Sequence, residues 1–418
     1  MKIIHTADWH IGRTLCERSL LEDQQYFLDQ LVTLLAEEQA DVLLIAGDLY
    51  DRSVPPAAAV SLLDRTFCRI LEETPAKILA ISGNHDSGQR LSFASSLLKA
   101  GGLYIASVFQ NDLEEVVLHD AFGEVHFFLM PYFDPAAVRN RCDVPVKTHD
   151  DLVQTLLAQN AHRFNPANRN VLVAHGFFCW TGENCELSDS EISIGGADMV
   201  DARCLEPFDY AALGHLHAPQ RVGRDSIRYA GSLLKYSASE ARQRKSVCIA
   251  ELKEKGGLSV RLETIPPLHE LRQVAGPIDE LLAACPENGC ADYLFAQLTD
   301  KGEVLDPMNR LRAVYPNILG LSFDRENEEG DSVCLQADKL ESKPPEALFA
   351  EFFEKMTGEP PDDAEQALIA EICRQAAPGR PGSRKKTALP RQTKQTPGEY
   401  SGLLSKLSKY PPYSLLNL

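Results

Sequence analysis

Three short apolar runs constrain the fold of this chain more than any other feature of its sequence. They span residues 41–46, 76–81 and 170–174, and each is apolar almost throughout. Strands that are covered on both faces have such continuous runs, because both sets of their side chains point into a core. Each run ends at a glycine or a histidine, and polar side chains follow at once. The runs therefore predict buried strands with polar groups beyond their carboxyl ends.

Helical patterns precede and follow the first of these predicted strands. Apolar residues recur at helical spacing from Leu20 to Glu38, and a second helical stretch, opened by a proline, runs from Pro56 to Glu73. Strands that alternate with helices predict a layered α/β fold in which β-sheets are flanked by helices. In such sheets, binding sites form outside the carboxyl ends of the strands.

Five short segments carry carboxylate, amide or imidazole side chains at predicted strand ends. In chain order they are Asp8-Trp9-His10, Gly47-Asp48 with Asp51, Gly83-Asn84-His85-Asp86, His175-Gly176 and Gly214-His215-Leu216-His217. The two ligands of the first segment are two residues apart, as are those of the last, so an extended backbone would project each pair to one side. Each segment alone can occur by chance, but all five in this order predict a single shared site.

The donor types indicate which ions this site would hold. Carboxylate, amide oxygen and imidazole suit Mn²⁺, Fe²⁺ or Zn²⁺ and are poorly matched to a cysteine-rich structural zinc site. The donors suffice for two ions if one carboxylate bridges them, and Asp48 is the best candidate because it follows the most apolar strand. Two ions about 3.5–4 Å apart can bind a phosphate and stabilise the attacking and leaving oxygens. We therefore expect the chain to hydrolyse phosphate esters.

Two residues beside the ligands are candidates for catalysis without binding metal. His85 follows the ligand Asn84, so it can face the phosphate and act on the leaving oxygen as a general acid or stabilise developing charge. Asp51, three residues after Asp48, is placed to accept a hydrogen bond from His85 and to favour its protonated form. Asp86 is a weaker alternative for this orienting role.

The other histidines and the cysteines show no comparable context. No Cys-x-x-Cys pair occurs, and Cys179 and Cys185, the cysteines nearest to the predicted site, are interpreted as incidental thiols rather than ligands. We interpret the remaining histidines as structural or surface residues: His5, His119, His126, His149, His162 and His269.

Size and charge limit the possible classes of protein. A chain of 418 residues exceeds what one core usually fills, so at least two compact units are expected. No apolar run approaches the roughly 20 residues that span a bilayer, and no targeting signal is recognised, so we expect a cytoplasmic protein without membrane contact. The formal charge of −18 argues against a protein that coats nucleic acid by charge alone. If DNA is the substrate, metals, local patches or a partner must hold it.

Composition predicts four segments. Residues 1–268 contain all five ligand segments and end at a pair of prolines. Residues 269–340 form a predicted small α+β unit, with strands at 293–298 and 318–323 around a helix, which we interpret as a structural or substrate-shaping cap.

The last two predicted segments have no ligand motif. Residues 343–377 are predicted helices with an apolar stripe, which either packs on its own domain or docks a partner protein. Residues 378–418 are rich in proline, glycine, serine and basic residues, and we expect them to form a disordered basic tail.

The five ligand segments resemble the pattern of the calcineurin-like metallophosphoesterase superfamily, which reads Asp-x-His, Gly-Asp-x-x-Asp, Gly-Asn-His-Asp/Glu, Gly-His and Gly-His-x-His. Their neighbours, including His5–Gly12 and Tyr229–Ser232, are similar to the SbcD family of bacterial nuclease subunits, strongly so over residues 1–240. The resemblance implies Mn²⁺ as the usual ion and His85 as the catalytic histidine. It also implies two ligand sets that share one carboxylate, Asp8, His10, Asp48 and His217 for one metal and Asp48, Asn84, His175 and His215 for the other.

The same resemblance implies a partner and a substrate. Its members act with the SbcC ATPase in DNA repair, recombination and replication, as ATP-dependent exonucleases on double-stranded ends and as endonucleases on single strands and hairpins. It implies a homodimer of nuclease subunits within a heterotetramer, with residues 343–377 docked on SbcC. Two alternatives remain open: a phosphomonoesterase or cyclic-nucleotide phosphodiesterase with the same metals, and a non-catalytic scaffold.

Overall fold

The computed structural model describes most of residues 1–324, and Met1–Arg325 form one compact unit, distinct from Glu326–Leu418. The described residues are 1–324 without 142–144, 181, 183–184, 189–190, 192–197, 286–289 and 303, together with 361, 362 and 366. The predicted helices at 343–377, the predicted tail at 378–418 and the end of the predicted cap therefore lie almost wholly outside the described residues. Among the helices that are described, none is both long and apolar enough to cross a membrane.

Of the two six-stranded sheets in the described part of the chain, the first contains the N-terminal strand. Its order is β16-β15-β1-β4-β5-β6, with the last four strands parallel and the first two antiparallel to their neighbours. The strands are β1 (Lys2–Thr6), β4 (Val42–Ala46), β5 (Lys77–Ile81), β6 (Leu103–Ala106), β15 (Val247–Leu252) and β16 (Leu258–Glu263). The apolar runs at 41–46 and 76–81 thus form the buried parallel strands that the sequence predicts.

The second sheet also has four parallel strands, but its antiparallel strands β13 and β7 lie at opposite edges. Its order is β13-β14-β12-β9-β8-β7. The strands are β7 (Glu114–Asp120), β8 (Gly123–Met130), β9 (Arg169–His175), β12 (Tyr210–Gly214), β13 (Gln220–Val222) and β14 (Arg224–Tyr229). The third apolar run, at 170–174, is central here, and every residue of β9 is buried.

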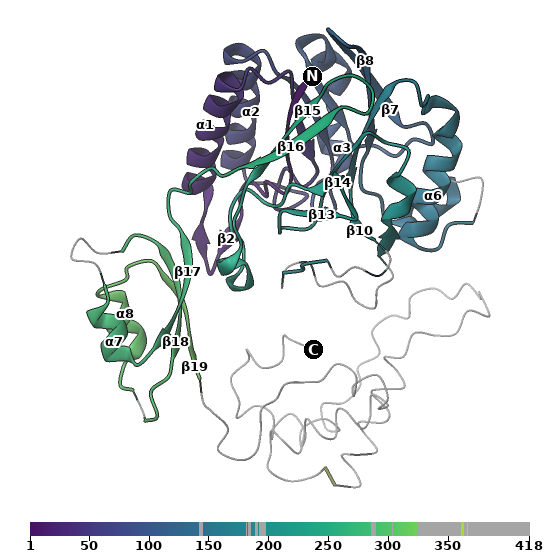
Figure 1. Cartoon of the computed structure of the whole chain (residues 1–418). Helices are drawn as coiled ribbons and strands as arrows, with labels where there is room; N and C mark the ends of the chain where they lie inside the picture. Colours follow the sequence, from purple (N-terminus) through teal and green to yellow (C-terminus); the bar gives the residue numbers. More distant parts are fainter. Residues whose placement is uncertain are drawn as a thin grey trace, which may run out of the picture. The chain divides into compact units, whose positions relative to one another are not determined.

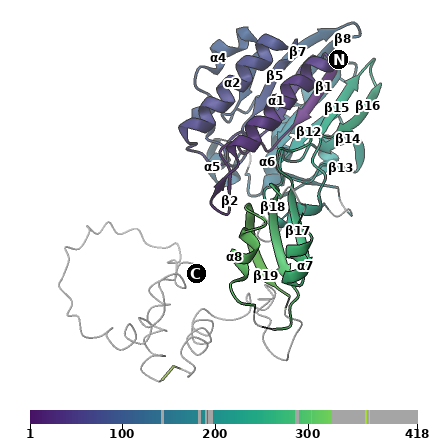
Figure 2. The ribbon, with the colours of Figure 1, turned by 90° about the vertical axis from the view of Figure 1, so that its left-hand side faces the viewer.

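Helices cover the outer faces of the two sheets, so the unit has four layers (Figure 1). Helices α1 (Leu21–Glu37) and α2 (Ala57–Glu73) lie side by side on the first sheet, as Figure 2 shows. Helix α6 (His149–Asn160) packs on the second sheet and begins with a capping box of Thr148 and Asp151. Between the sheets, apolar residues of both inner faces form a continuous core that includes Leu44, Phe127 and Val173. The layered α/β architecture agrees with the sequence prediction.

Shorter elements connect these layers. They are β2 (Thr14–Leu15), β3 (Arg18–Ser19), α3 (Gly88–Leu91), α4 (Ser95–Leu98), α5 (Pro135–Val138), β10 (Phe177–Cys179), β11 (Met199–Asp201) and several short 3₁₀ turns.

A three-stranded parallel sheet follows the two large ones in the chain. Its strands are β17 (Leu271–Gly276), β18 (Tyr293–Leu298) and β19 (Ile318–Phe323), and α7 (Ile278–Ala283) and α8 (Pro307–Arg312) pack on it with a core of their own. The sequence predicts β18, α8 and β19 but misses β17 and α7. Three hydrogen bonds to the buried Asp23 of α1 attach this sheet, from the Tyr293 hydroxyl at 2.8 Å, from His269 Nδ1 at 2.9 Å and from His269 N at 3.2 Å.

A buried arginine, Arg169 at the start of β9, fixes the edge of the second sheet. Its guanidinium donates to both carboxylate oxygens of Asp120, at 2.6 and 2.9 Å, and to the main-chain oxygens of Gly123 and Lys253. The hydrogen bond from Arg169 holds the pKa of Asp120 well below its ordinary value, despite the opposing effect of burial. The pair therefore joins β7 to the start of β9, and Arg169 extends the link to the residue after β15 by a hydrogen bond to a main-chain oxygen.

Asp120→Asn should lower the free energy of unfolding by about 2 kcal/mol at neutral pH, because the buried Arg169 loses its charged partner. Since the folded-state pKa is depressed, the carboxylate stabilises the fold above the unfolded-state pKa of about 3.9, and this contribution is lost as pH falls through the folded-state pKa. Urea denaturation from pH 7 to pH 3 should show the difference between wild type and variant shrinking below about pH 4.

Asp225→Asn is the control for this measurement, because Asp225 pairs with Arg228 at the surface, where its side chain is 73% exposed. Its effect should stay within about 0.5 kcal/mol. A difference for Asp120→Asn that does not depend on pH would contradict the ionic origin of the effect.

Candidate metal centre

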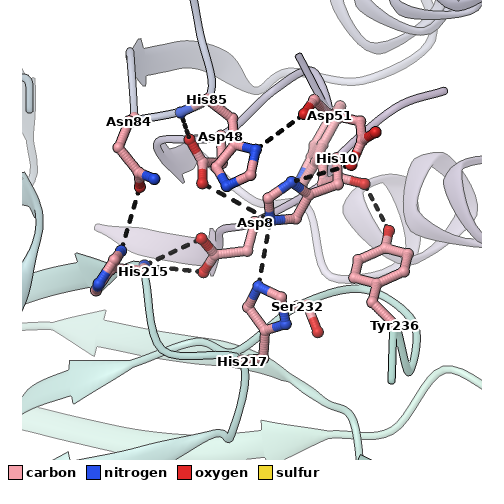
Figure 3. A network of polar contacts seen from close by, with 12 residues as sticks. Asp8, His10, Asp48, Asp51, Asn84, His85, His215, His217, Ser232 and Tyr236 are labelled. Carbon is pink, nitrogen blue, oxygen red and sulfur yellow. Dashed lines mark hydrogen bonds and ion pairs between the residues drawn. The ribbon is translucent and has the colours of Figure 1, made fainter. Parts of the chain in front are cut away.

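All five ligand segments meet at one end of the two sheets. Segments after β1, β4 and β5 of the first sheet face segments after β9 and β12 of the second, because the parallel strands of both sheets point the same way there. Figure 3 shows the side chains converging from both sheets. The seven residues predicted as ligands gather in this cluster: Asp8, His10, Asp48, Asn84, His175, His215 and His217.

One group of donors is built from both sheets. Donor atoms of Asp8, His10 and His217 all lie within 4.8 Å of one another, and all three residues are buried. The Nε2 atoms of His10 and His217 face each other at 3.2 Å. Two imidazole nitrogens this close can share one proton or bind one cation between them, so this geometry suits a metal ion.

A second group of donors lies beside the first. Asn84 Oδ1 is 2.9 Å from His175 Nε2 and 3.2 Å from His215 Nδ1. Asp48 lies between the groups, since its Oδ2 is 3.7 Å from His10 Nε2 and 3.6 Å from His175 Nε2. Its carboxylate is thus within reach of both groups, which is the position that a bridging ligand needs.

Without bound cations, burying these carboxylates and imidazoles has a large desolvation cost. Burial raises the pKa of Asp8 well above its ordinary value, and the charge of Asp48 raises it further. Burial likewise lowers the pKa of His175 and of His215 to about 3, so both imidazoles are neutral and have a free lone pair. A site with buried carboxylates and neutral imidazoles offsets its own desolvation cost only when cations bind, so these residues fit two divalent metal ions.

The backbone of the ligand segments is unusual. Asp8, His10, Asp48 and His215 all have positive φ, at 52°, 45°, 50° and 109°. Few residues other than glycine adopt such angles, and they cluster at functional sites. The expectation that Asp8 and His10 project from an extended backbone is therefore wrong, and it is wrong for His215 as well.

Main-chain hydrogen bonds hold these turns in place. Asp8 N donates to Gly47 O at 3.1 Å, and His10 N donates to Asp48 O at 2.9 Å. The carboxylate of Asp8 in turn accepts a hydrogen bond from His215 N. Each of these ligand segments is therefore braced by another ligand segment rather than by its own strand.

Glycines that precede the ligands permit this close approach. A Cβ atom on Gly47, whose φ is +90°, would lie 2.3 Å from His175 Nδ1. One on Gly83 would lie 2.1 Å from Asp48 Oδ1. Any side chain at these two positions would displace a ligand, so the glycines of the motifs are required by space.

His85 contacts Asp51, but through the main chain. His85 Nδ1 lies 2.9 Å from the Asp51 main-chain oxygen, whereas the Asp51 carboxylate accepts a hydrogen bond from Arg13 at 2.8 Å. The sequence interpretation had the carboxylate orienting His85, and the structure differs because Arg13 occupies it. Asp86 accepts hydrogen bonds from the main-chain nitrogens of Leu49, Tyr50 and Gly83, and so joins two ligand loops.

Sequence reasoning missed the residues that orient His217. Glu240 is fully buried, and its Oε1 lies 3.1 Å from His217 Nδ1. Glu191 accepts a hydrogen bond from His217 N at 2.5 Å, and Lys245 Nζ donates to Glu240 at 2.6 Å and to His217 O at 2.8 Å. These residues are 23 to 28 positions from His217. No local motif signals them, because only the folded chain brings them together.

Glu240 selects the tautomer of His217. Burial alone would raise the pKa of this carboxyl, but the hydrogen bond with His217 and the charge of Lys245 lower it to about 2. The ionised carboxylate accepts a hydrogen bond from Nδ1 of His217, which directs the lone pair of Nε2 at His10.

Fold and site together define a metal-dependent phosphoesterase. A family model described as calcineurin-like phosphoesterase matches residues 1–219, and one described as type 5 capsule protein repressor C-terminal domain matches residues 267–357. The SbcD subunit of nuclease SbcCD from Staphylococcus epidermidis is 34% identical over 365 residues, which are 85% of this chain and 94% of that protein. The protein of the same name from Staphylococcus saprophyticus is 34% identical over 367 residues, 86% of this chain and 94% of that one.

The chain belongs to the SbcD family of nuclease subunits, within the calcineurin-like phosphoesterases. A solved structure of a dimetal phosphatase from Danio rerio is 11% identical, with a TM-score of 0.37, and its match covers 64% of this chain and 98% of that one.

Glu240→Gln should weaken one of two metal-binding events by about 10- to 100-fold, because the amide no longer fixes the His217 tautomer. Isothermal titration of the purified chain with Mn²⁺ as the probe ion measures both events separately. The other event should keep its wild-type affinity, and thermal unfolding without metal should show that the variant is folded.

The matched control is Glu186→Gln, because Glu186 is exposed and contacts only Gln220 and Gln243 among the residues described. It should bind Mn²⁺ as the wild type does. Identical titrations of Glu240→Gln and wild type would disprove the orienting role of Glu240.

Proposed function

We propose that this metal-dependent phosphodiester hydrolase cleaves DNA with two Mn²⁺ ions, as the nuclease subunit of a complex with an SbcC ATPase. The observation that carries the proposal is the position of the Asp48 carboxylate between two groups of donors. Asp8, His10, Asp48 and His217 would hold one ion. The other would be held by Asp48, Asn84, His175 and His215.

The residues beside the ions have separable tasks in this proposal. Bound ions would supply charge for the phosphate oxygens and lower the pKa of an attacking water. His85 donates from Nδ1 to the Asp51 main chain, so its Nε2 is the atom that can face the leaving oxygen. When Nε2 is protonated, it can transfer that proton to the leaving group. Asp51 supports this geometry by its main-chain oxygen and by holding Arg13.

Relatives support DNA as the substrate and SbcC as the partner. Both Staphylococcus proteins are named as subunits of the nuclease SbcCD, and the match extends over 94% of each. The net charge of −18 agrees with a nuclease that depends on its partner to hold a polyanion. We propose ATP-dependent exonuclease activity on double-stranded ends and endonuclease activity on single strands and hairpins, in cytoplasmic DNA repair.

The segments of the chain have distinct tasks in such a complex. We assign nuclease chemistry to residues 1–268, a capping role to 269–340 and SbcC binding to 343–377, with two nuclease subunits per heterotetramer. The basic residues of 378–418 would approach DNA phosphates.

Cleavage assays with Mn²⁺, SbcC and ATP should show degradation of linear duplex DNA and opening of hairpin DNA, and EDTA should abolish both. Nitrophenyl phosphate and a cyclic nucleotide serve as small substrates in parallel. Hydrolysis of a small substrate without any cleavage of DNA would replace the nuclease proposal by a phosphomonoesterase or cyclic-nucleotide phosphodiesterase.

His85→Ala should reduce DNA cleavage by about 10²- to 10⁴-fold, because the leaving oxygen loses its proton donor. The variant should still bind two Mn²⁺ ions in a calorimetric titration, because His85 is not among the proposed ligands. His162→Ala is the control, since His162 is exposed and contacts the main chain of Gln159. Wild-type cleavage by His85→Ala would refute the proposed role.

A further inference from the structure

A cavity of about 210 Å³ opens beside the candidate metal centre. Asn84, His175 and His215, the donors of the second group, form one wall. The remaining walls come from the segment after β8, from α6 and from the β10–β11 region. A molecule in this cavity therefore touches the same side chains that would hold an ion and its phosphate.

The lining of the cavity suits a flat ring. Leu152, Leu156 and Val200 are buried and apolar, and the half-buried rings of Phe133 and Phe177 lie at its rim. Such walls give water few hydrogen-bond partners. They offer instead the dispersion contacts that an aromatic ring system can use.

Besides the donors of the second group, further polar side chains line this cavity. The rings of Tyr132 and His149 stack with centroids 5.2 Å apart, and the Tyr132 hydroxyl lies 3.0 Å from His149 Nε2. Asp198 pairs with His149 Nδ1 at 3.0 Å. Tyr132 also meets the edge of His175, at 6.1 Å between centroids, so this aromatic pair adjoins the metal centre directly. His149, interpreted from sequence as structural or surface, thus lines a cavity at the site.

We propose that this cavity binds one unstacked nucleobase, that of a nucleotide next to the phosphate being cleaved. This inference rests on the proposed nuclease function and adds a determinant of substrate choice to it. The volume is below the roughly 300–1,000 Å³ typical of pockets for drug-sized ligands, so it takes one ring system rather than a whole nucleotide. A lining that combines apolar side chains with polar ones matches a nucleobase, which has two apolar faces and a polar rim.

A base can enter only after it leaves the helical stack. Unstacking costs least for unpaired or single-stranded bases. The cavity therefore favours single strands, hairpin loops and frayed ends over the interior of a duplex, and it does so without reading sequence, because every base has a π-face.

The test uses the complete complex with Mn²⁺ and hairpin or single-stranded oligonucleotides in which one nucleotide flanking the cleaved phosphate is abasic. In the wild type, removing the base on one side should lower kcat/KM by about 10-fold, and removing it on the other side should have little effect. Tyr132→Ala should lower kcat/KM on the intact oligonucleotide by a similar factor. In this variant, removal of the base should cause no further decrease. On the oligonucleotide that lacks this base, both enzymes should cleave at the same rate, and bis(nitrophenyl) phosphate serves in parallel as a substrate without a nucleotide.

Val153→Trp provides a second variant, because Val153 lines the cavity from α6 and a larger ring there fills it without removing Tyr132. In the Val153→Trp variant, too, removal of the base should not lower kcat/KM. Phe122→Ala, at an exposed aromatic residue that does not line the cavity, should behave as the wild type.

The outcomes separate the two proposals. Equal cleavage by the wild type of the intact oligonucleotide and of both abasic oligonucleotides would overturn the nucleobase site and leave the nuclease proposal standing. Hydrolysis of the nitrophenyl ester with no cleavage of any oligonucleotide would overturn the proposed nuclease function, and the nucleobase site with it.

Discussion

The site depends on two carboxylates, Asp8 and Asp48, that are buried together where the carboxyl ends of two sheets meet. Isolated buried charges are costly, and these two also repel each other. Around them the chain places imidazoles that burial keeps neutral, turns with positive φ and loops braced across the sheets. These features fit a binding site for cations, because bound cations would offset the charge of the buried carboxylates.

Much of the fold follows from local pattern. The three apolar runs became central parallel strands because strands covered on both faces need no polar alternation. Strand β17 escaped prediction because it is half exposed, with residues such as Arg272 and Gln273 that break any apolar run. It pairs with the largely buried β18, so its place in the sheet depends on tertiary context rather than on its own residues.

The candidate site, like the fold, has features that the sequence predicts and features that it does not. The residues of the cluster were predictable as a group because they stand at or just beyond the ends of strands, and the sheets bring these ends together. Their backbone angles were not, since left-handed turns at Asp8 and His10 arise from hydrogen bonds to another loop. The roles of Glu240 and Lys245 were not predictable either. Glu240 orients the His217 ring and Lys245 binds Glu240, and only the folded chain brings these residues together.

A close backbone contact at Gly214 connects the candidate metal centre to the core between the two sheets. A Cβ there would lie 1.8 Å from Ala46 O, so the backbones of the two sheets touch beside the ligands. Four of the proposed ligands, Asp48 among them, come from the first sheet and three from the second, so each proposed ion would take ligands from both sheets. The separation between the two sheets therefore sets how closely the two halves of each ligand set approach each other. A residue larger than alanine at Ala46 or Ala212, deep in this core, would move these halves apart and weaken metal binding without removing any ligand.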